Sequence, residues 1–195
     1  NALEQKKLHI NKLKIIDKNS KILSIGSCFA VEIRKRLRNL NLNILPNYFS
    51  LKVDEKKFRI GNLPIRDNIN HYNTYTILYE FMRFDGTFQQ DSNDFWKIED
   101  RWFGNSIAYQ DPYRRAIYAK SKDLMLETSK KINREINRSI ELSDTIIITL
   151  GLTEVWVKSN NNKISCMNPG YAGGGGKDET IFYASSYFDN LKNLR

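Results

Sequence analysis

The stretch Lys-Ile-Leu-Ser-Ile-Gly-Ser-Cys-Phe-Ala, residues 21–30, decides the fold class of this 195-residue chain. Residues 21–25 form a short apolar run that is typical of a buried strand, and Gly26 ends it. From Phe29 the apolar spacing becomes helical, and one stripe collects Phe29, Ile33, Leu37 and Leu40. The stretch therefore predicts a strand, a tight turn and a helix.

A second apolar run, Thr-Ile-Ile-Ile-Thr-Leu, covers residues 145–150 and ends at Gly151. A continuous β-branched run is typical of a central parallel strand that is covered on both faces. Binding and catalytic sites in open α/β sheets lie at the carboxyl ends of the strands. We therefore expect the functional residues at Gly26–Cys28 and Gly151–Glu154.

The other segments complete a single α/β domain over residues 1–195, because this length is typical of one domain. Helices are expected at residues 73–84, 120–142 and 178–195, and a further strand at 42–45. Hairpins are expected at residues 95–109, inside an insertion over 85–115, and at 155–167. Residues 1–20 are expected to be irregular, residues 47–71 to hold turns, and residues 169–176 to form a glycine-rich loop.

The composition limits the possible partners. The 31 lysines and arginines exceed the 22 acidic residues and give a net charge of +9. Such a charge fits a nucleic-acid binder, but no zinc finger, recognition helix or RNA-binding aromatic motif accompanies it, so no nucleic-acid partner is expected. No apolar stretch of the length of a membrane span occurs. Two cysteines fit a reducing compartment, which predicts a cytoplasmic protein.

Several cofactor motifs are absent from the sequence. The loop Gly170–Lys177 has Tyr171 and Asp178 where a phosphate-binding loop needs Gly and Ser or Thr. No Gly-x-Gly-x-x-Gly follows a strand, and Cys28 and Cys166 have no histidine at zinc spacing. We therefore expect neither a cofactor nor a metal ion.

Ser27 and Cys28 are the candidate nucleophiles. A residue on a turn between a strand and a helix lies beside backbone N–H groups and the positive end of the helix, which favour a thiolate and a developing oxyanion. The alternative interpretation is structural. Cys28 would then be packed beneath the turn, and Ser27 would cap the helix.

Four other polar residues have both a functional and a structural interpretation. Glu154 is either a base or an orienting carboxylate, and Thr153 a substrate donor, unless both only cap the turn. Asn73 is either a helix N-cap or an amide donor to an oxyanion. His71 is a lone histidine, which is more often structural than catalytic.

Residues 26–30 spell Gly-Ser-Cys-Phe-Ala, and this motif resembles the GSCFA family, which is named for it. Further resemblances occur in order: Asn73–Thr76 to the family's Asn-x-Tyr-Thr, Asp111–Arg114 to Asp-Pro-Phe-Arg, Thr149–Trp156 to Thr-Leu-Gly-Leu-Thr-Glu-x-Trp, and Pro169-Gly170 to its Pro-Gly loop. The resemblance spans about residues 21–195.

This resemblance implies an SGNH/GDSL-like hydrolase fold, a three-layer α/β/α sandwich with a parallel, flavodoxin-like sheet. Cys28 would take the place of the nucleophilic Ser of that superfamily, with Ser27 and Gly26 before it. Gly151–Glu154 would match the Gly-x-Asn-Asp block, with Thr153 in place of the oxyanion-hole Asn and Asn73 as a replacement amide. The Asp-x-x-His motif is missing, so the expectation is a C-terminally truncated domain whose general base follows Arg195.

The predicted function is hydrolysis or transfer of an acyl ester, carried by a small molecule or a carbohydrate. Cys28 or Ser27 would attack, Gly26, Asn73, Gly151 and Thr153 would bind the oxyanion or the substrate, and Glu154 would hold the neighbouring loop. The alternative is a non-catalytic carbohydrate-binding or assembly module in surface-polysaccharide biosynthesis. Its sugar platforms would be Trp96, Trp102 and Trp156, although large aromatic residues more often pack in a core.

Overall fold

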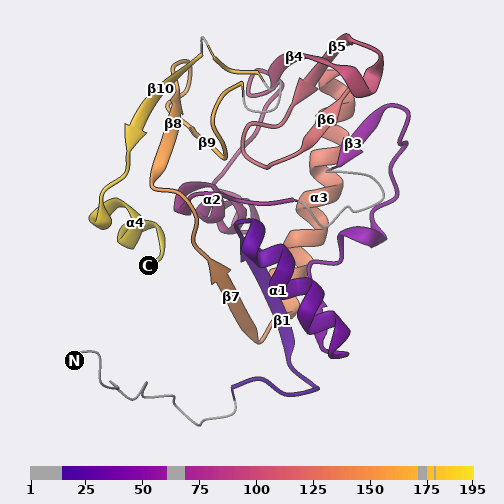
Figure 1. Cartoon of the computed structure of the whole chain (residues 1–195), viewed down its shortest axis with the longest axis vertical. Helices are drawn as coiled ribbons and strands as arrows, with labels where there is room; N and C mark the ends of the chain where they lie inside the picture. The colour runs from indigo at the N-terminus through magenta and orange to yellow at the C-terminus, as the bar shows by residue number, and fades with distance from the viewer. Residues whose placement is uncertain (1–14, 61–68, 171–174, 178) are drawn as a thin grey trace, which may run out of the picture.

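The computed structural model describes residues 15–60, 69–170, 175–177 and 179–195. Its central element is a parallel sheet in which β1 (Lys21–Gly26) lies between β2 (Asn43–Leu45) and β7 (Thr145–Thr149). Figure 1 shows β1 and β7 side by side next to α1 (Cys28–Asn39). The α/β class and the predicted strand, turn and helix over residues 21–30 are therefore confirmed.

The expectation that β7 is covered on both faces is wrong. β7 lies at the edge of the parallel sheet as far as the described residues extend, and Ile146 and Ile148 are 46% and 38% exposed. Hydrophobicity alone does not distinguish an edge strand from a central one, because both carry β-branched side chains. The run therefore identifies the strand but not its place in the sheet.

A second sheet is antiparallel and has the order β3-β6-β5-β4, with β3 (Phe58–Ile60), β6 (Ile117–Ala119), β5 (Ser106–Gln110) and β4 (Trp96–Asp100). The hairpin predicted at residues 95–109 is confirmed as β4 and β5, joined through the short helix η3 (Arg101–Phe103). The strands β3 and β6 are not predicted, because three residues are too few to show a periodicity. Another short helix, η1 (Tyr48–Ser50), precedes β3.

The third sheet contains β9 (Ile164–Ser165), β8 (Glu154–Lys158) and β10 (Thr180–Ala184), with β8 in the middle. The predicted hairpin at residues 155–167 is confirmed, but the helix predicted over residues 178–195 is wrong. Residues 180–183 are β-branched or aromatic and pair with β8, so they form a strand. Only α4 (Tyr187–Asn193) is helical, and it begins at the capping box of Ser186 and Asp189.

The helices α2 (Thr74–Phe84) and α3 (Lys122–Leu142) agree with the predicted ranges. They pack against each other, and α3 also contacts β1, β5 and β6, as Figure 1 shows. The predicted stripe of α1 is wrong: the helix buries Ala30, Val31 and Arg34, and Phe29 is 64% exposed. The guanidinium of Arg34 donates to the carbonyl of Ser24 over 2.8 Å, so a cation occupies part of the buried face.

Parts of three predictions lie outside the described residues. These are residues 1–14 of the irregular N-terminal segment, residues 61–68 of the segment with turns, and residues 171–174 of the glycine-rich loop. In the described part of that loop, Gly175 and Gly176 lie against Trp96, and a Cβ on either would come within 3 Å of it. The described end of the loop is therefore packed on the β4 strand.

Candidate functional site

Three segments that are distant in sequence meet at the carboxyl ends of β1 and β7. The backbone N–H of His71 donates to the carbonyl of Gly26 over 2.8 Å. The N–H of Leu152 donates to the carbonyl of Tyr72 over 2.6 Å, and the N–H of Ser27 donates to that of Thr149 over 3.2 Å. The structure thus brings the turns after the two strands together, with residues 71–73 between them.

Two glycines permit this close approach. Gly26 has φ of +135°, and a Cβ on it would lie 2.2 Å from the carbonyl oxygen of Thr149. A Cβ on Gly151 would lie 2.5 Å from the carbonyl oxygen of Tyr72 and 3.3 Å from Cβ of Ser27. Any larger residue at either position would push the segments apart.

Ser27 is buried and has a structural role. It is the N-cap of α1, and its Oγ accepts a 3.4 Å hydrogen bond from the N–H of Phe29. The same Oγ lies 3.2 Å from Oγ1 of Thr149, and the Ser27 N–H donates to that Oγ1 over 3.0 Å. The capping interpretation of Ser27 is therefore confirmed.

Cys28 is the first residue of α1, and its side chain is an exposed free thiol. The interpretation in which this cysteine is packed beneath the turn is therefore wrong. The first N–H groups of a helix have no partners within the helix, so they can bind an anion that approaches the turn. A thiol, the positive end of a helix and backbone donors thus occur at one accessible point.

Tyr72 is a polar residue of this site that the sequence did not single out. It is half-buried, burial raises the pKa of its phenol, and a charge on Cys28 would raise that pKa further. The phenol therefore remains protonated and able to donate a hydrogen bond at neutral pH. The sequence feature that could have identified Tyr72 is its position between His71 and Asn73, which were both candidate site residues.

The amide of Asn73 takes part in the fold. Its Oδ1 accepts from the N–H of Thr76 over 3.0 Å as the N-cap of α2, and its Nδ2 donates to the carbonyl of Ser165 over 2.8 Å. The side chain is also buried, with 1% of its surface exposed. The N-cap interpretation of Asn73 is therefore confirmed.

Thr153 and Glu154 lie just beyond the meeting point and have exposed side chains. The carbonyl of Thr153 accepts from the N–H and the Oγ of Ser185, which ties this turn to the end of β10. Glu154 begins β8 and pairs with Ala184. Both side chains are accessible from solvent beside the Cys28 turn.

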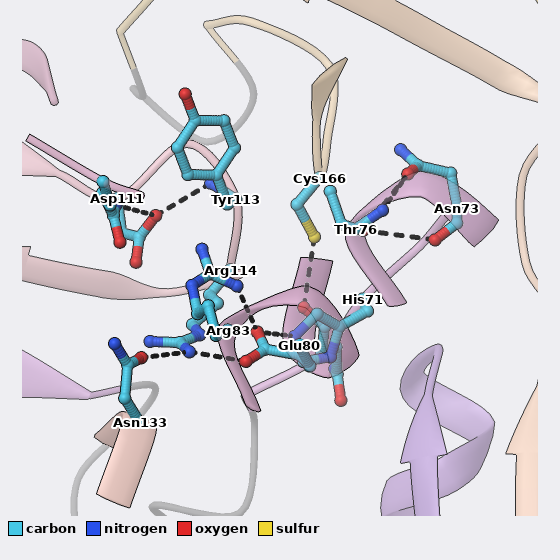
Figure 2. Close-up of polar contacts among 12 residues, drawn as sticks. His71, Asn73, Thr76, Glu80, Arg83, Asp111, Tyr113, Arg114, Asn133 and Cys166 are labelled. Atoms are coloured by element: carbon cyan, nitrogen blue, oxygen red, sulfur yellow. Dashed lines mark hydrogen bonds and ion pairs between the residues drawn. The ribbon is translucent and has the colours of Figure 1, made fainter. Parts of the chain in front are cut away.

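Beneath the segment 71–73 lies a buried charge cluster, shown in Figure 2. Glu80 Oε1 is 2.7 Å from Nε2 of His71 and 3.0 Å from a terminal nitrogen of Arg83. Arg114 donates to both oxygens of Glu80 over 2.7 and 2.6 Å, and also to Asn133 over 2.6 Å. The cluster links α2 to α3 through the loop that precedes β6.

The electrostatics of the cluster keep His71 neutral. Burial lowers the pKa of His71 and outweighs the attraction of Glu80, while Arg114 and Arg83 lower it further. Burial alone would raise the pKa of Glu80, but the charges of Arg114 and Arg83 hold it well below its usual value. The structural interpretation of His71 is therefore favoured, because its side chain is buried and paired with the Glu80 carboxylate.

Cys166 is also a free thiol, but it is buried whereas Cys28 is exposed. It is 1% exposed, its Sγ lies 3.1 Å from the carbonyl oxygen of Asn70, and burial raises its pKa to about 12. Among the described residues, no group of three or more His, Cys, Asp or Glu side chains could hold a metal ion. Cys28 is thus the accessible one of the two cysteine thiols.

The three tryptophans occupy different environments. Trp96 is fully buried, and Trp156 packs edge-on against Phe182 with ring centroids 5.9 Å apart. Trp102 is 50% exposed and lines a cavity of about 620 Å³ on the antiparallel sheet. Core packing thus explains Trp96, and Trp102 alone of the three lies open at a cavity in the described structure.

The comparisons with known proteins agree with the sequence motifs. The model of the GSCFA family matches residues 21–189, so this chain belongs to the GSCFA family. No curated protein and no solved structure matches the chain. None of the helices that the structure describes is long and apolar enough to cross a membrane.

Proposed function

We propose that this protein hydrolyses or transfers an acyl ester through a covalent thioester on Cys28, within an SGNH-like arrangement of strands. The observation that carries the proposal is the exposed thiol of Cys28 at the start of α1, where β1 and β7 end together. Sites of open α/β sheets lie at such strand ends, and the helix end favours the attacking anion.

In the proposed reaction, the thiolate of Cys28 attacks the acyl carbonyl carbon. The backbone N–H of Cys28 and the phenol of Tyr72 donate hydrogen bonds to the oxyanion as the tetrahedral intermediate forms. The intermediate collapses, the ester C–O bond breaks, and the alcohol leaves with a proton. Water, or a second alcohol, then attacks the thioester and releases the thiol.

Other residues position the reacting groups. Ser27 caps α1 and fixes the turn, while Gly26 and Gly151 allow the three segments to approach. Thr153 and Glu154, exposed beside the turn, contact the substrate and hold its loop in this proposal. His71 is paired with Glu80, so it does not serve as the general base in this proposal.

The rival function is a non-catalytic carbohydrate-binding or assembly module, and the exposure of Trp102 at a cavity favours it. The two functions differ in what they require of Cys28. A hydrolase needs the thiol, whereas a binding module does not.

The test is hydrolysis of a short-chain p-nitrophenyl ester, with mass spectrometry of the protein to locate the acyl group. We expect the acyl group on Cys28 and a loss of turnover of up to about a millionfold in Cys28→Ala, the size of effect that loss of a nucleophile produces. Full turnover in Cys28→Ala, or an acyl group on another residue, would contradict the proposal.

Ser27→Ala needs a matched control, because it removes a helix cap. Ser121 is the N-cap of α3, accepts from the N–H of Leu124 over 3.2 Å, and belongs to none of the segments that meet at Cys28. Each Ala variant should lose about 1 kcal/mol of stability. If Ser27→Ala alone abolishes acylation at equal stability, Ser27 is the nucleophile.

A further inference from the structure

A cavity on the antiparallel sheet is separate from the Cys28 turn. It has a volume of about 620 Å³ and is lined by Arg59 of β3, Tyr118 of β6 and residues 98–102 of β4 and η3. Ligand cavities for small molecules have volumes of roughly 300–1,000 Å³. None of its lining residues belongs to the segments that meet at Cys28. The cavity therefore has the size of a site for a small ligand with one or two rings.

The wall of the cavity is an exposed aromatic ring. Trp102 is 50% exposed and lies in a one-turn helix whose N-cap, Asp100, accepts from the Trp102 N–H over 2.7 Å. Gly104 ends that turn with φ of +74°. A backbone that is already ordered loses little entropy when a ligand binds to its side chain. Trp102 thus offers an exposed stacking surface on an ordered turn.

Arg59, on the edge strand β3, contacts both aromatic rings of the cavity and Asp100. Its guanidinium carbon lies 5.6 Å from the ring centroid of Trp102 and 4.1 Å from that of Tyr118. It also forms a 2.6 Å ion pair with Asp100, which joins the edge strands β3 and β4. Arg59 lies closer to the ring of Tyr118, which is buried, than to that of Trp102, so Trp102 is the more accessible aromatic surface of the cavity.

The charges of the cavity balance. Arg59 and Arg101 are matched by Glu99 and Asp100, and the exposed pair Glu99 and Arg101 remains at the rim. A carboxylate only accepts hydrogen bonds and a guanidinium only donates them, and a hydroxyl group satisfies both. A balanced charge gives little attraction for a phosphate. The lining therefore suits a neutral ligand with many hydroxyl groups and an apolar face.

We propose that this cavity binds a neutral sugar ring, with the apolar C–H face of the ring on Trp102 and its hydroxyl groups on Glu99 and Arg101. In the protein, this site would select a carbohydrate substrate for the ester chemistry at Cys28, and this role rests on the proposed function. Binding itself requires no step at Cys28.

The test measures binding in a Cys28→Ala background, so that failure of the ester chemistry leaves it unaffected. Methyl glucoside, methyl galactoside, N-acetylglucosamine and maltose are screened at millimolar concentrations by saturation-transfer NMR, with adenosine as a second planar probe. Trp102→Ala should weaken sugar binding about tenfold, about 1.4 kcal/mol. Trp102→Phe, which keeps a ring, should bind nearly as well.

Ile107→Ala is the matched control, because Ile107 is also exposed (54%) on the same sheet but does not line the cavity. Circular dichroism verifies folding, and if Trp102→Ala does not fold, Glu99→Ala at the rim replaces it. Binding that is weakened by the cavity variants and kept in Ile107→Ala supports the proposal. No sugar binding, binding indifferent to the cavity variants, or binding of adenosine instead of sugars would overturn it.

Discussion

At the scale of single residues, the two cysteines show how the environment determines reactivity. Both are free thiols, but Cys28 is exposed on a helix N-terminus and Cys166 is enclosed in the core. Only an accessible thiol that can ionise acts as a nucleophile. The proposed chemistry therefore depends on whether a cysteine is buried. The residues next to Cys28 and Cys166 in the sequence do not reveal this.

We predict that iodoacetamide modifies Cys28 and spares Cys166 in the native protein. Cys166 is 1% exposed and burial raises its pKa to about 12, so it reacts only after unfolding. Peptide mass spectrometry after a short exposure, with a urea-unfolded sample as control, measures both sites. Equal modification of the two thiols in the native protein would contradict the structure.

His71 gives a second prediction, on the pH dependence of stability. Its pKa is lowered in the folded state, whereas an unfolded histidine takes up a proton near pH 6.5. Below that pH the unfolded state binds more protons, so the free energy of unfolding falls, by at most about 1.4 kcal/mol per pH unit. Glu80, with its lowered pKa, costs further stability only in more acidic solution.

The measurement is denaturant unfolding at several pH values between about 7 and 5, where ordinary carboxyl groups stay largely ionised. His71→Gln should flatten the decline in the free energy of unfolding, whatever its effect on the absolute value. His9→Gln, which changes the chain's other histidine, is the control and should leave the decline in place. A decline that persists in His71→Gln would show that another group causes it.

At the scale of elements, the strand-to-helix turn requires Gly26 for two separate reasons. Its φ of +135° is unfavourable for other residues, and a Cβ would collide with the carbonyl of Thr149. Gly86 shares the positive φ, at +83°, but has open space around it. Comparing a substitution at Gly26 with one at Gly86 therefore distinguishes the cost of backbone strain from the cost of the steric contact between β1 and β7.

We therefore expect Gly26→Ala to lower the free energy of unfolding by more than about 3 kcal/mol, because strain and overpacking add. Gly86→Ala should cost only about 1 kcal/mol, the strain alone. Thermal or denaturant unfolding measures both values. Equal losses in the two variants would mean that the approach of Thr149 to Gly26 is looser than the structure has it.

At the scale of the whole molecule, large exposed apolar side chains gather on the elements β7, β10 and α4. They are Ile146, Ile148, Ile181, Phe182, Tyr183, Tyr187 and Phe188. Exposed apolar area of this kind favours association, while the net charge of +9 opposes it. The balance between the two depends on salt, because salt screens only the charge.

We predict that the protein associates increasingly as salt rises from about 0.01 to 0.5 M, since the Debye length shortens from about 30 Å to a few ångströms. Sedimentation velocity measures the association. Phe182→Lys should reduce it, because it replaces apolar area with charge. Ile107→Lys, which changes charge equally at an exposed site on β5, should reduce it less. An equal effect of the two variants would point to charge alone.

The sequence by itself determined the local chemistry. Residues 21–30 and 145–150 identified two of the three parallel strands and the turn that carries Cys28, because a short apolar run that ends in glycine is a local signal of a strand. The N-cap roles of Ser27 and Asn73 were also among the predicted alternatives, since capping depends on neighbours only two or three residues away. The family could also be recognised from the sequence, because each of its motifs is a short contiguous stretch of residues.

Only the tertiary structure decided which interpretation of each residue holds. In the folded chain the thiol of Cys28 is exposed, and His71 is buried beside Glu80. The amide of Asn73 donates to Ser165, and the carbonyl of Tyr72 accepts from Leu152 at the site. The tertiary structure also placed β7 at an edge and made residues 180–184 a strand that pairs with β8. Burial and pairing depend on contacts between residues far apart in the chain, and a local pattern carries no information on those contacts.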